Sequence, residues 1–402
     1  MTVTSPARSG TYVRARRPLR LSGTTRLIAV FVAVIVVLGG CSSGRPGGDR
    51  DSARSPGVQA DPQPGRGDDA EDDDSRASGT SGEAGTGGTH TEPTDPPDRG
   101  QPPLPDPASV GANELGVIPI IMYHRINDDG GSDYDNTTAE FQRELRLLYD
   151  AGYRPVRVVD LVDGTIDLPA GTSPVVLTFD DSSPSQFRVD EIGAPHPNTA
   201  VGMLYSFAAA HPDFIPTGTM YVLGNPFGAT GERAARLLQE LDALGFEVGN
   251  HTLDHGNLRQ LGNAGAVRDL ANGAQHVEQA IGIGPRTLAL PFGVWPDDRD
   301  VVRSGTYASY TYQHDGIVLV GAGPSPSPFS AAFDPLAIPR IRSQPDYDPD
   351  DEPDYGSGYW LWLLEQEPER KYVSDGHPEL VSFPAELADQ LDPRFADRAN
   401  PY

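Results

Sequence analysis

The sequence predicts an α/β fold built around a parallel sheet, and three observations support this prediction. Short apolar runs alternate with amphipathic segments of helical periodicity, which is typical of strands and helices in a parallel sheet with covered faces. Residues 117–344, which contain this alternation, have a length that suits a barrel of parallel strands. Residues 42–113, which precede this alternation, have scarcely any large apolar residue. We therefore expect one folded domain behind a disordered tether.

The elements of the domain follow one another in regular order. Residues 118–124 are a continuous apolar run, as expected for a strand that is buried on both faces. Residues 138–152 carry Phe141, Leu145 and Leu148 at helical spacing, with Thr138 suited to the N-cap and Gly152 to the C′ position. We expect further strands at residues 156–159, 175–179, 219–222 and 246–248 and before Pro291, and further helices at residues 232–244 and 264–281.

The C-terminal part of the chain is expected to form an extension of this domain, over residues 346–402. Its first ten residues are acidic and rich in proline, which favours a loop. The tail from Tyr359 carries Trp360, Trp362 and Leu363, enough apolar surface to pack back on the domain.

The N-terminus has the pattern of an export signal, which we place at residues 1–40. Several arginines precede an apolar run of twelve residues, Leu27 to Leu38, which is too short for the roughly 20 residues that span a bilayer. Gly39 and Gly40 then precede Cys41, the only cysteine in the chain, and this pattern resembles the lipobox of bacterial lipoproteins. We expect Cys41 to carry a lipid that anchors the protein to the membrane, a chance cysteine being the alternative.

Composition limits the function further. The 402 residues include 45 glycines and 39 prolines, about a fifth of the chain, and much of this content lies in the expected tether, residues 41–113. The net charge of −26 keeps the protein soluble and excludes nucleic acid as a natural partner. A single cysteine excludes an internal disulfide and any zinc site that needs several cysteines.

Two adjacent carboxylates, Asp180 and Asp181, follow the expected strand at residues 175–179. Placing them together at the end of a buried strand costs repulsion and desolvation energy, which a bound divalent cation would relieve. The alternative is a solvated turn in which an aspartate caps a helix.

A second pattern, His251 and His255, has the spacing at which two imidazoles on one helical turn reach the same metal ion. Thr252 stands where a zinc peptidase of the HExxH type has its glutamate, which argues against that class. Two histidines and one carboxylate make a three-ligand set with open positions, as in hydrolytic metal sites or non-haem iron centres.

The third pattern is a strand stopped by Pro291, Phe292 and Gly293. Backbone N–H groups at such a stop lack ladder partners and can donate to a developing oxyanion, although the same tripeptide is also a common turn.

Together and in this order, the patterns resemble the polysaccharide deacetylases of carbohydrate esterase family 4 over residues 117–345. Thr178-Phe-Asp-Asp181 matches the first family motif, with Ser182 where glycine is usual, and Gly249-Asn-His-Thr-Leu-Asp-His255 matches the second. The third motif is present only in part, as Ala289-Leu-Pro-Phe292. The resemblance implies a distorted (β/α) barrel, placed at residues 114–345, with its site at the carboxyl ends of the strands.

The resemblance also implies roles for these residues. Asp181, His251 and His255 would bind a divalent metal, expected to be zinc, that polarises the acetyl carbonyl and acidifies a water molecule. Asp180 would be the general base. The oxyanion would lie between the metal and the backbone N–H of Phe292, next to Pro291.

The chain departs from the family pattern at three places. Ser182 replaces a glycine, and Ala289 stands where many members have an arginine that orients the base, for which we expect Arg340 to substitute. The late leucine-x-histidine that supplies the general acid has no match. His124 is our candidate acid because it follows a strand and so faces a barrel mouth, the alternative being a packing histidine. His314 and His377 are weaker candidates.

Two functions remain open from the sequence. The first is a metal-dependent hydrolase that removes N-acetyl, or alternatively O-acetyl, groups from an acetylated polysaccharide of the cell envelope or its surroundings. The second is an inactive glycan-binding lipoprotein that retains the barrel. Either would be an exported monomer, lipid-anchored to the outer face of the cytoplasmic membrane.

Overall fold

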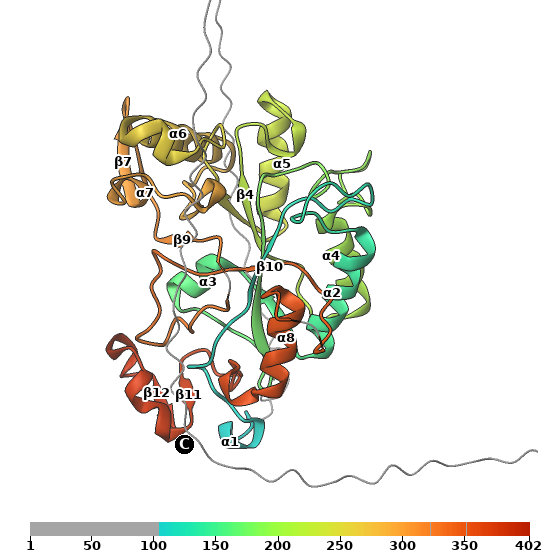
Figure 1. Ribbon diagram of the computed structural model, residues 1–402, viewed down its shortest axis with the longest axis vertical. Helices are drawn as coiled ribbons and strands as arrows, with labels where there is room; N and C mark the ends of the chain where they lie inside the picture. The colour runs from blue at the N-terminus through green and yellow to red at the C-terminus, as the bar shows by residue number, and fades with distance from the viewer. Residues whose placement is uncertain (1–103, 322, 351) are drawn as a thin grey trace, which may run out of the picture. The chain divides into compact units, whose positions relative to one another are not determined.

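Eight parallel strands form the central sheet of the computed structural model, which describes residues 104–321, 323–350 and 352–402 (Figure 1). The strand order is β10-β1-β3-β4-β5-β6-β9, and β2 pairs with the first half of β3. The strands are β1 (Ile120–Tyr123), β2 (Tyr153–Val156), β3 (Ser173–Phe179), β4 (Thr219–Val222), β5 (Glu247–Asn250), β6 (Thr287–Ala289), β9 (Gly316–Val318) and β10 (Ile341–Arg342).

The two edges of this sheet are joined through residues 338–342. Ile338 donates its N–H to Ile317 and accepts from Leu319, next to β9, whereas β10 pairs with β1 at the other edge. The sheet thus curves into a distorted barrel, and the predicted (β/α) fold class is confirmed.

Helices cover the outside of the barrel. Figure 1 shows α2, α4 and α5 on one side, and α6, α7 and the β7–β8 hairpin toward the other. The α-helices are α1 (Pro107–Val110), α2 (Thr138–Asp150), α3 (Val158–Asp163), α4 (Ala200–Ala210), α5 (Gly231–Ala243), α6 (Leu258–Ile281), α7 (Asp300–Arg303) and α8 (Ser357–Gln366). Short 3₁₀ turns are η1 (Pro226–Gly228), η2 (Pro291–Gly293), η3 (Pro368–Arg370), η4 (Ala385–Gln390) and η5 (Pro393–Phe395).

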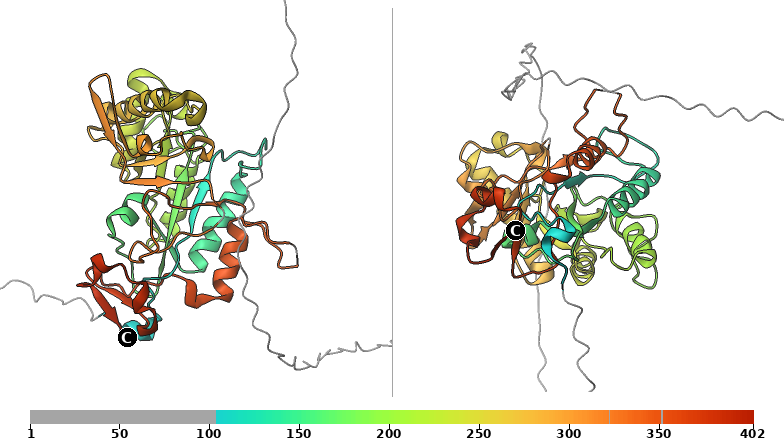
Figure 2. Two further views of the ribbon diagram at one scale, coloured as in Figure 1. Left: turned by 60° about the vertical axis from the view of Figure 1, so that its left-hand side comes forward. Right: turned by 90° about the horizontal axis from the view of Figure 1, so that it is seen from below.

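Residues 367–402, the C-terminal segment, lie at the end of the barrel at which β1 begins (Figure 2). Its strands β11 (Val381–Phe383) and β12 (Ala399–Pro401) pair with each other, as do β7 (Ser304–Tyr307) and β8 (Tyr310–Gln313) of the earlier hairpin. Tyr372, Val381 and Phe383 are buried in one cluster with residues that precede and form β1. Tyr402 donates a hydrogen bond to the carbonyl oxygen of Ala112, so the two ends of the described chain meet there.

Most expected elements are present. The strand at residues 219–222 matches β4, and the helix at residues 138–152 is α2, although its N-cap is Thr137 rather than Thr138. The strand expected at residues 156–159 is correct only at Val156, because β2 lies earlier and the chain begins α3 after Arg157. Among the described residues, no helix has the length and apolar character needed to cross a bilayer.

The tether boundary at residue 113 is placed too late. Asp106 caps α1 through a hydrogen bond from Ala108, and Ala112 and Asn113 are buried against the C-terminal segment. The expected signal peptide, Cys41 and the tether as far as residue 103 lie outside the described residues.

Candidate active site

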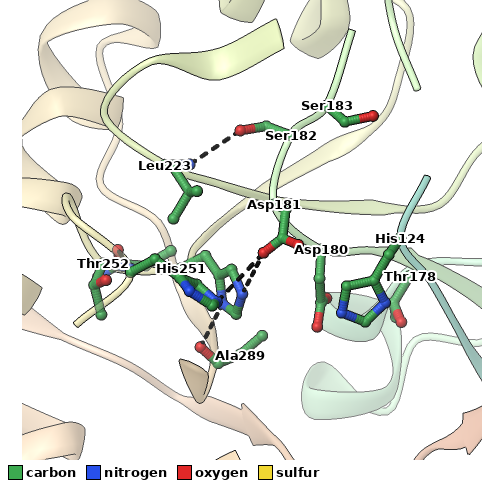
Figure 3. A network of polar contacts seen from close by, with 12 residues as sticks. His124, Thr178, Asp180, Asp181, Ser182, Ser183, Leu223, His251, Thr252 and Ala289 are labelled. Carbon is green, nitrogen blue, oxygen red and sulfur yellow. Dashed lines mark hydrogen bonds and ion pairs between the residues drawn. The ribbon is translucent and has the colours of Figure 1, made fainter. Parts of the chain in front are cut away.

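Three side chains meet at the carboxyl ends of β3 and β5 (Figure 3). Asp181 follows β3, and its Oδ1 lies 3.4 Å from Nε2 of His251 and 3.3 Å from Nε2 of His255. The three ligand atoms lie within 4.8 Å of one another. The structure thus brings together the three residues for which the sequence predicts metal binding.

The two histidines do not share a helical turn, in contrast to the geometry expected from their spacing. β5 ends at Asn250, and residues 251–257 form a loop in which Thr252 and His255 have positive φ angles of 68° and 54°. The buried carboxylate of Asp269 on α6 holds this loop by accepting hydrogen bonds from three of its backbone N–H groups, those of Leu253, Asp254 and Gly256. Asp269 was missed from the sequence because its partners lie 13 to 16 residues away.

The backbone next to Asp181 explains the glycine that is usual at position 182. Asp181 and Ser182 have φ angles of 70° and 46°, in the left-handed region where a side chain is strained. Ser182 nevertheless fits, because its Oγ accepts a hydrogen bond from the N–H of Leu223 at 3.2 Å and its carbonyl accepts one from Phe227. These two hydrogen bonds fix the backbone of the turn that carries Asp181.

Asp180 forms a buried ion pair with Arg340. The two guanidinium nitrogens of Arg340 donate to the two carboxylate oxygens at 2.7 and 2.8 Å, and the side chains are 0% and 3% exposed. Arg340 lies on the segment that closes the barrel, which aims its side chain at the end of β3. Burial acts to raise the pKa of Asp180, but the adjacent guanidinium outweighs it and holds that pKa well below its usual value.

His124 follows β1 and lies beside Asp180 (Figure 3). Its ring packs on Tyr134 with the centroids 5.1 Å apart, and its buried Nδ1 has no hydrogen-bond partner among the described residues. Burial lowers the pKa of His124, against the charges of Asp180 and Asp181. The buried Gln186, another residue missed from the sequence, fixes both backbones by donating to the carbonyl oxygens of His124 and Asp180.

A cavity of about 400 Å³ opens above these groups. Its lining residues are His124, Arg125, Ser132, Tyr134, Asp135, Asp180, Asp181, His251, His255, Leu290, Phe292 and Val320. Phe292 has a φ of 59° and lines the cavity with a largely exposed ring, whereas Pro291 is buried and does not line it. Pro291 therefore stands next to the cavity wall rather than on it, and the backbone N–H of Phe292 is the group of this turn that the cavity can use.

The weaker histidine candidates lie outside the cavity. His314 is buried between the carbonyl oxygen of Val302 and the side chain of Asn250, and burial lowers its pKa to about 4. His377 lies in the C-terminal segment, where its Nδ1 accepts from the N–H of Glu379. These hydrogen bonds hold His314 and His377 to other parts of the protein and away from the cavity.

The Asp181, His251 and His255 cluster fits a divalent cation. The Nδ1 of His251 donates to the carbonyl oxygen of Ala289 at 2.9 Å, which leaves Nε2 with its lone pair toward Asp181. Oδ1 of Asp181 is buried and has no hydrogen-bond partner among the described residues. Burial opposes ionisation of Asp181, but the hydrogen bond and charge of His251, when its Nε2 is protonated, lower the pKa of Asp181, and a bound cation would take the place of that proton. One carboxylate and two imidazoles are ligands that zinc accepts.

The fold and the site together define a (β/α)-barrel protein with a hydrolase-type cluster of carboxylates and histidines at its mouth. Residues 168–311 match the family model described as polysaccharide deacetylase. The chain therefore carries a polysaccharide deacetylase domain, and the family predicted from the motifs is confirmed. No curated protein matches the chain in sequence.

Several solved structures resemble this chain. The deacetylase PplD of Streptococcus pyogenes, in complex with acetate, is 20% identical with a TM-score of 0.44, over 58% of this chain and 95% of that one. IcaB from Ammonifex degensii is 21% identical with a TM-score of 0.40, over 57% and 93%. BC0361, a polysaccharide deacetylase from Bacillus cereus, is 20% identical with a TM-score of 0.41, over 56% and 64%.

Proposed function

We propose that this protein hydrolyses N-acetyl groups on a polysaccharide of the cell envelope or its surroundings, in a reaction that depends on a divalent metal ion. The observation that carries this proposal is that two carboxylates with different partners line one cavity. Asp181 lies against two histidines, and Asp180 is locked by Arg340 beside them. We further propose that the protein acts as a monomer outside the cytoplasm, anchored by a lipid on Cys41.

Asp181, His251 and His255 would hold the ion, with zinc as the best fit to this ligand set. When bound, such an ion acts as a Lewis acid toward the acetyl carbonyl and lowers the pKa of water. The hydrogen bond from His251 to Ala289 and the loop held by Asp269 fix the directions of the two imidazoles. The chain thus supplies a rigid ligand set rather than one that must be ordered by binding.

Asp180 is the proposed general base and takes a proton from the attacking water. Its low pKa keeps the carboxylate ionised throughout the neutral range. The two hydrogen bonds from Arg340 fix the plane of its carboxylate. Arg340 thereby takes the place of the arginine that many family members carry at the position of Ala289.

His124 is the proposed general acid, which delivers a proton to the leaving amine. It lines the same cavity as Asp180 and carries a ring nitrogen that no described residue engages. The N–H of Phe292, at a turn with positive φ on the cavity wall, is the proposed donor to the developing oxyanion.

Metal analysis and acetate release together test the proposal. The purified protein is expected to bind about one zinc ion and to release acetate from N-acetylglucosamine oligomers. His251→Ala should lose the metal, whereas Asp180→Asn should keep the metal and lose acetate release by a factor of at least about 10². His377→Ala, a histidine outside the cavity, is the matched control and should retain both properties. A metal-free protein that binds glycan without releasing acetate would establish the binding-only alternative instead.

A further inference from the structure

A second cleft, of about 410 Å³, adjoins the active-site cavity. Its lining residues are Asp133, Asp135, Asn136, Glu140, Arg342, Ser343, Gln344, Pro345 and Asp346. Asp135 lines both spaces, whereas Tyr134 lines only the cavity and Asp133 only the second cleft. The segment from Asp133 to Asp135 is therefore the shared wall, and a polymer seated in the cavity reaches the second cleft by crossing it.

The second cleft is negatively charged. Four carboxylates line it, against the single guanidinium of Arg342, which already donates to the carbonyl oxygen of Asp133 and to Gln344. The side chain of Asp135 is only 4% exposed and is paired with Arg125, and Glu140 accepts the N–H and hydroxyl of Thr137 at the start of α2. Asp346 is paired with Arg143, but both of these side chains are exposed, so water and salt weaken the pair. Asp133 is exposed as well, so Asp133 and Asp346 are the carboxylates that keep most of their attraction for a cation.

A buried acceptor without a donor lies in the same cleft. Asn136 is only 4% exposed, and its Nδ2 donates to Ser343 Oγ at 3.0 Å. Its Oδ1 has no hydrogen-bond partner among the described residues. A buried carbonyl oxygen without a donor is costly, which indicates that a donor group from outside the chain is needed here. The charge and this open acceptor both point to a ligand that is rich in donors and positively charged.

We propose that the second cleft binds a sugar unit with a free amino group, next to the acetylated unit that occupies the active-site cavity. This inference rests on the proposed function, because each hydrolysis converts a neutral acetamide into a basic amine, which carries a positive charge when it is protonated. Such a unit presents an ammonium group and several hydroxyls, which match the carboxylates and the acceptor of Asn136. The preferred substrate is then a partly deacetylated chain rather than a fully acetylated one.

The test compares N-acetylglucosamine tetramers that differ in one group. One is fully acetylated, and the others carry a single free amine at a defined position. The wild type should have a kcat/KM at least about threefold higher for one of the amine-bearing tetramers, because an exposed charge pair adds a modest attraction. This preference should shrink when the salt concentration is raised from 20 to 200 mM.

The double variant Asp133→Asn, Asp346→Asn should bring the ratio of the two kcat/KM values to about one. The matched control is Glu386→Gln, Asp389→Asn, which removes two exposed carboxylates from η4 in the C-terminal segment and should keep the wild-type ratio. Because the ratio is measured within each variant, a general loss of activity does not alter it. Retained zinc content shows that each variant is folded.

Direct binding separates this inference from the proposed function. A fully deacetylated glucosamine tetramer should bind the wild type more tightly than the double variant in calorimetry. If the wild type releases acetate equally well from all tetramers, the inference is overturned and the proposed function stands. If no substrate is deacetylated but the glucosamine tetramer still binds through Asp133 and Asp346, the proposed function fails and the cleft remains. Equal binding to wild type and double variant overturns the inference in either case.

Discussion

Replacing Arg340 by methionine should leave the Asp180 carboxylate buried without a counterion. Both side chains are almost completely buried, and the two hydrogen bonds between them are 2.7 and 2.8 Å long. Arg340 also donates to the carbonyl oxygen of Leu319 and to Thr178, so it ties three strands of the barrel together. Breaking a buried pair by removing one partner costs about 3–5 kcal/mol, and we expect the free energy of unfolding to fall by that amount.

Urea denaturation of the wild type, Arg340→Met, Asp180→Asn and the double variant measures this effect as a thermodynamic cycle. The double variant should be more stable than Arg340→Met, because it no longer contains an isolated buried charge. Arg340→Lys keeps the charge but not the two-pronged geometry, and it should lie between the wild type and Arg340→Met.

The same substitution should move the pH profile. Arg340 lowers the pKa of Asp180, so without it this pKa rises and the acidic limb of kcat/KM shifts to higher pH. An Arg340→Met protein with wild-type stability and an unchanged acidic limb would show that the pair neither stabilises the barrel nor orients the base.

Two further predictions concern buried carboxylates. Asp269→Asn should weaken zinc binding by about 10- to 100-fold in a chelator competition, because an amide leaves only one acceptor oxygen for the N–H groups on both sides of His255. Asp254→Asn, at an exposed position of the same loop, should not weaken it. Burial, together with the charge of Asp375, raises the pKa of Glu114 to about 8. Glu114 therefore favours the folded state in its protonated form, and this stability is lost as pH rises from about 4.5 to about 8. At about 1.36 kcal/mol per pH unit, the loss is at most about 5 kcal/mol. Urea denaturation should show a much smaller fall for Glu114→Gln over this range, and an equal fall would contradict the assignment.

Strands and amphipathic helices were predictable because their burial pattern is local. The run that forms β3 is buried at every position, and α2 buries Phe141, Leu145 and Leu148 on one face. Helix α4 was missed because Val201, Met203 and Leu204 make it apolar on several sides, which removes the periodic signal. The strand expected at residues 156–159 ends at Val156 because a distant group helps to fix the backbone beyond it: Glu247 accepts the N–H of Val159 at the start of α3.

In the site, too, residues of short sequence motifs were predictable, whereas residues that act on distant parts of the chain were not. Asp180, Asp181, His251 and His255 are recognisable from short motifs, and Arg340 from its place near a strand end. The side chains that hold them are not, because Asp269 and Gln186 act through backbone groups that only the folded chain brings near. Even the loop that carries the two histidines was mistaken for a helical turn, since their spacing alone does not distinguish the two geometries.

The hydrogen bond between Tyr402 and Ala112 lies at the back of the barrel, the end opposite the active-site cavity. The chain enters and leaves the described part beside the start of β1, and the cavity lies beyond the other ends of the strands. A bead, a purification tag or a fused protein joined directly at Tyr402 would sit behind the barrel. Its mouth would remain open to a large, insoluble substrate approaching from the front.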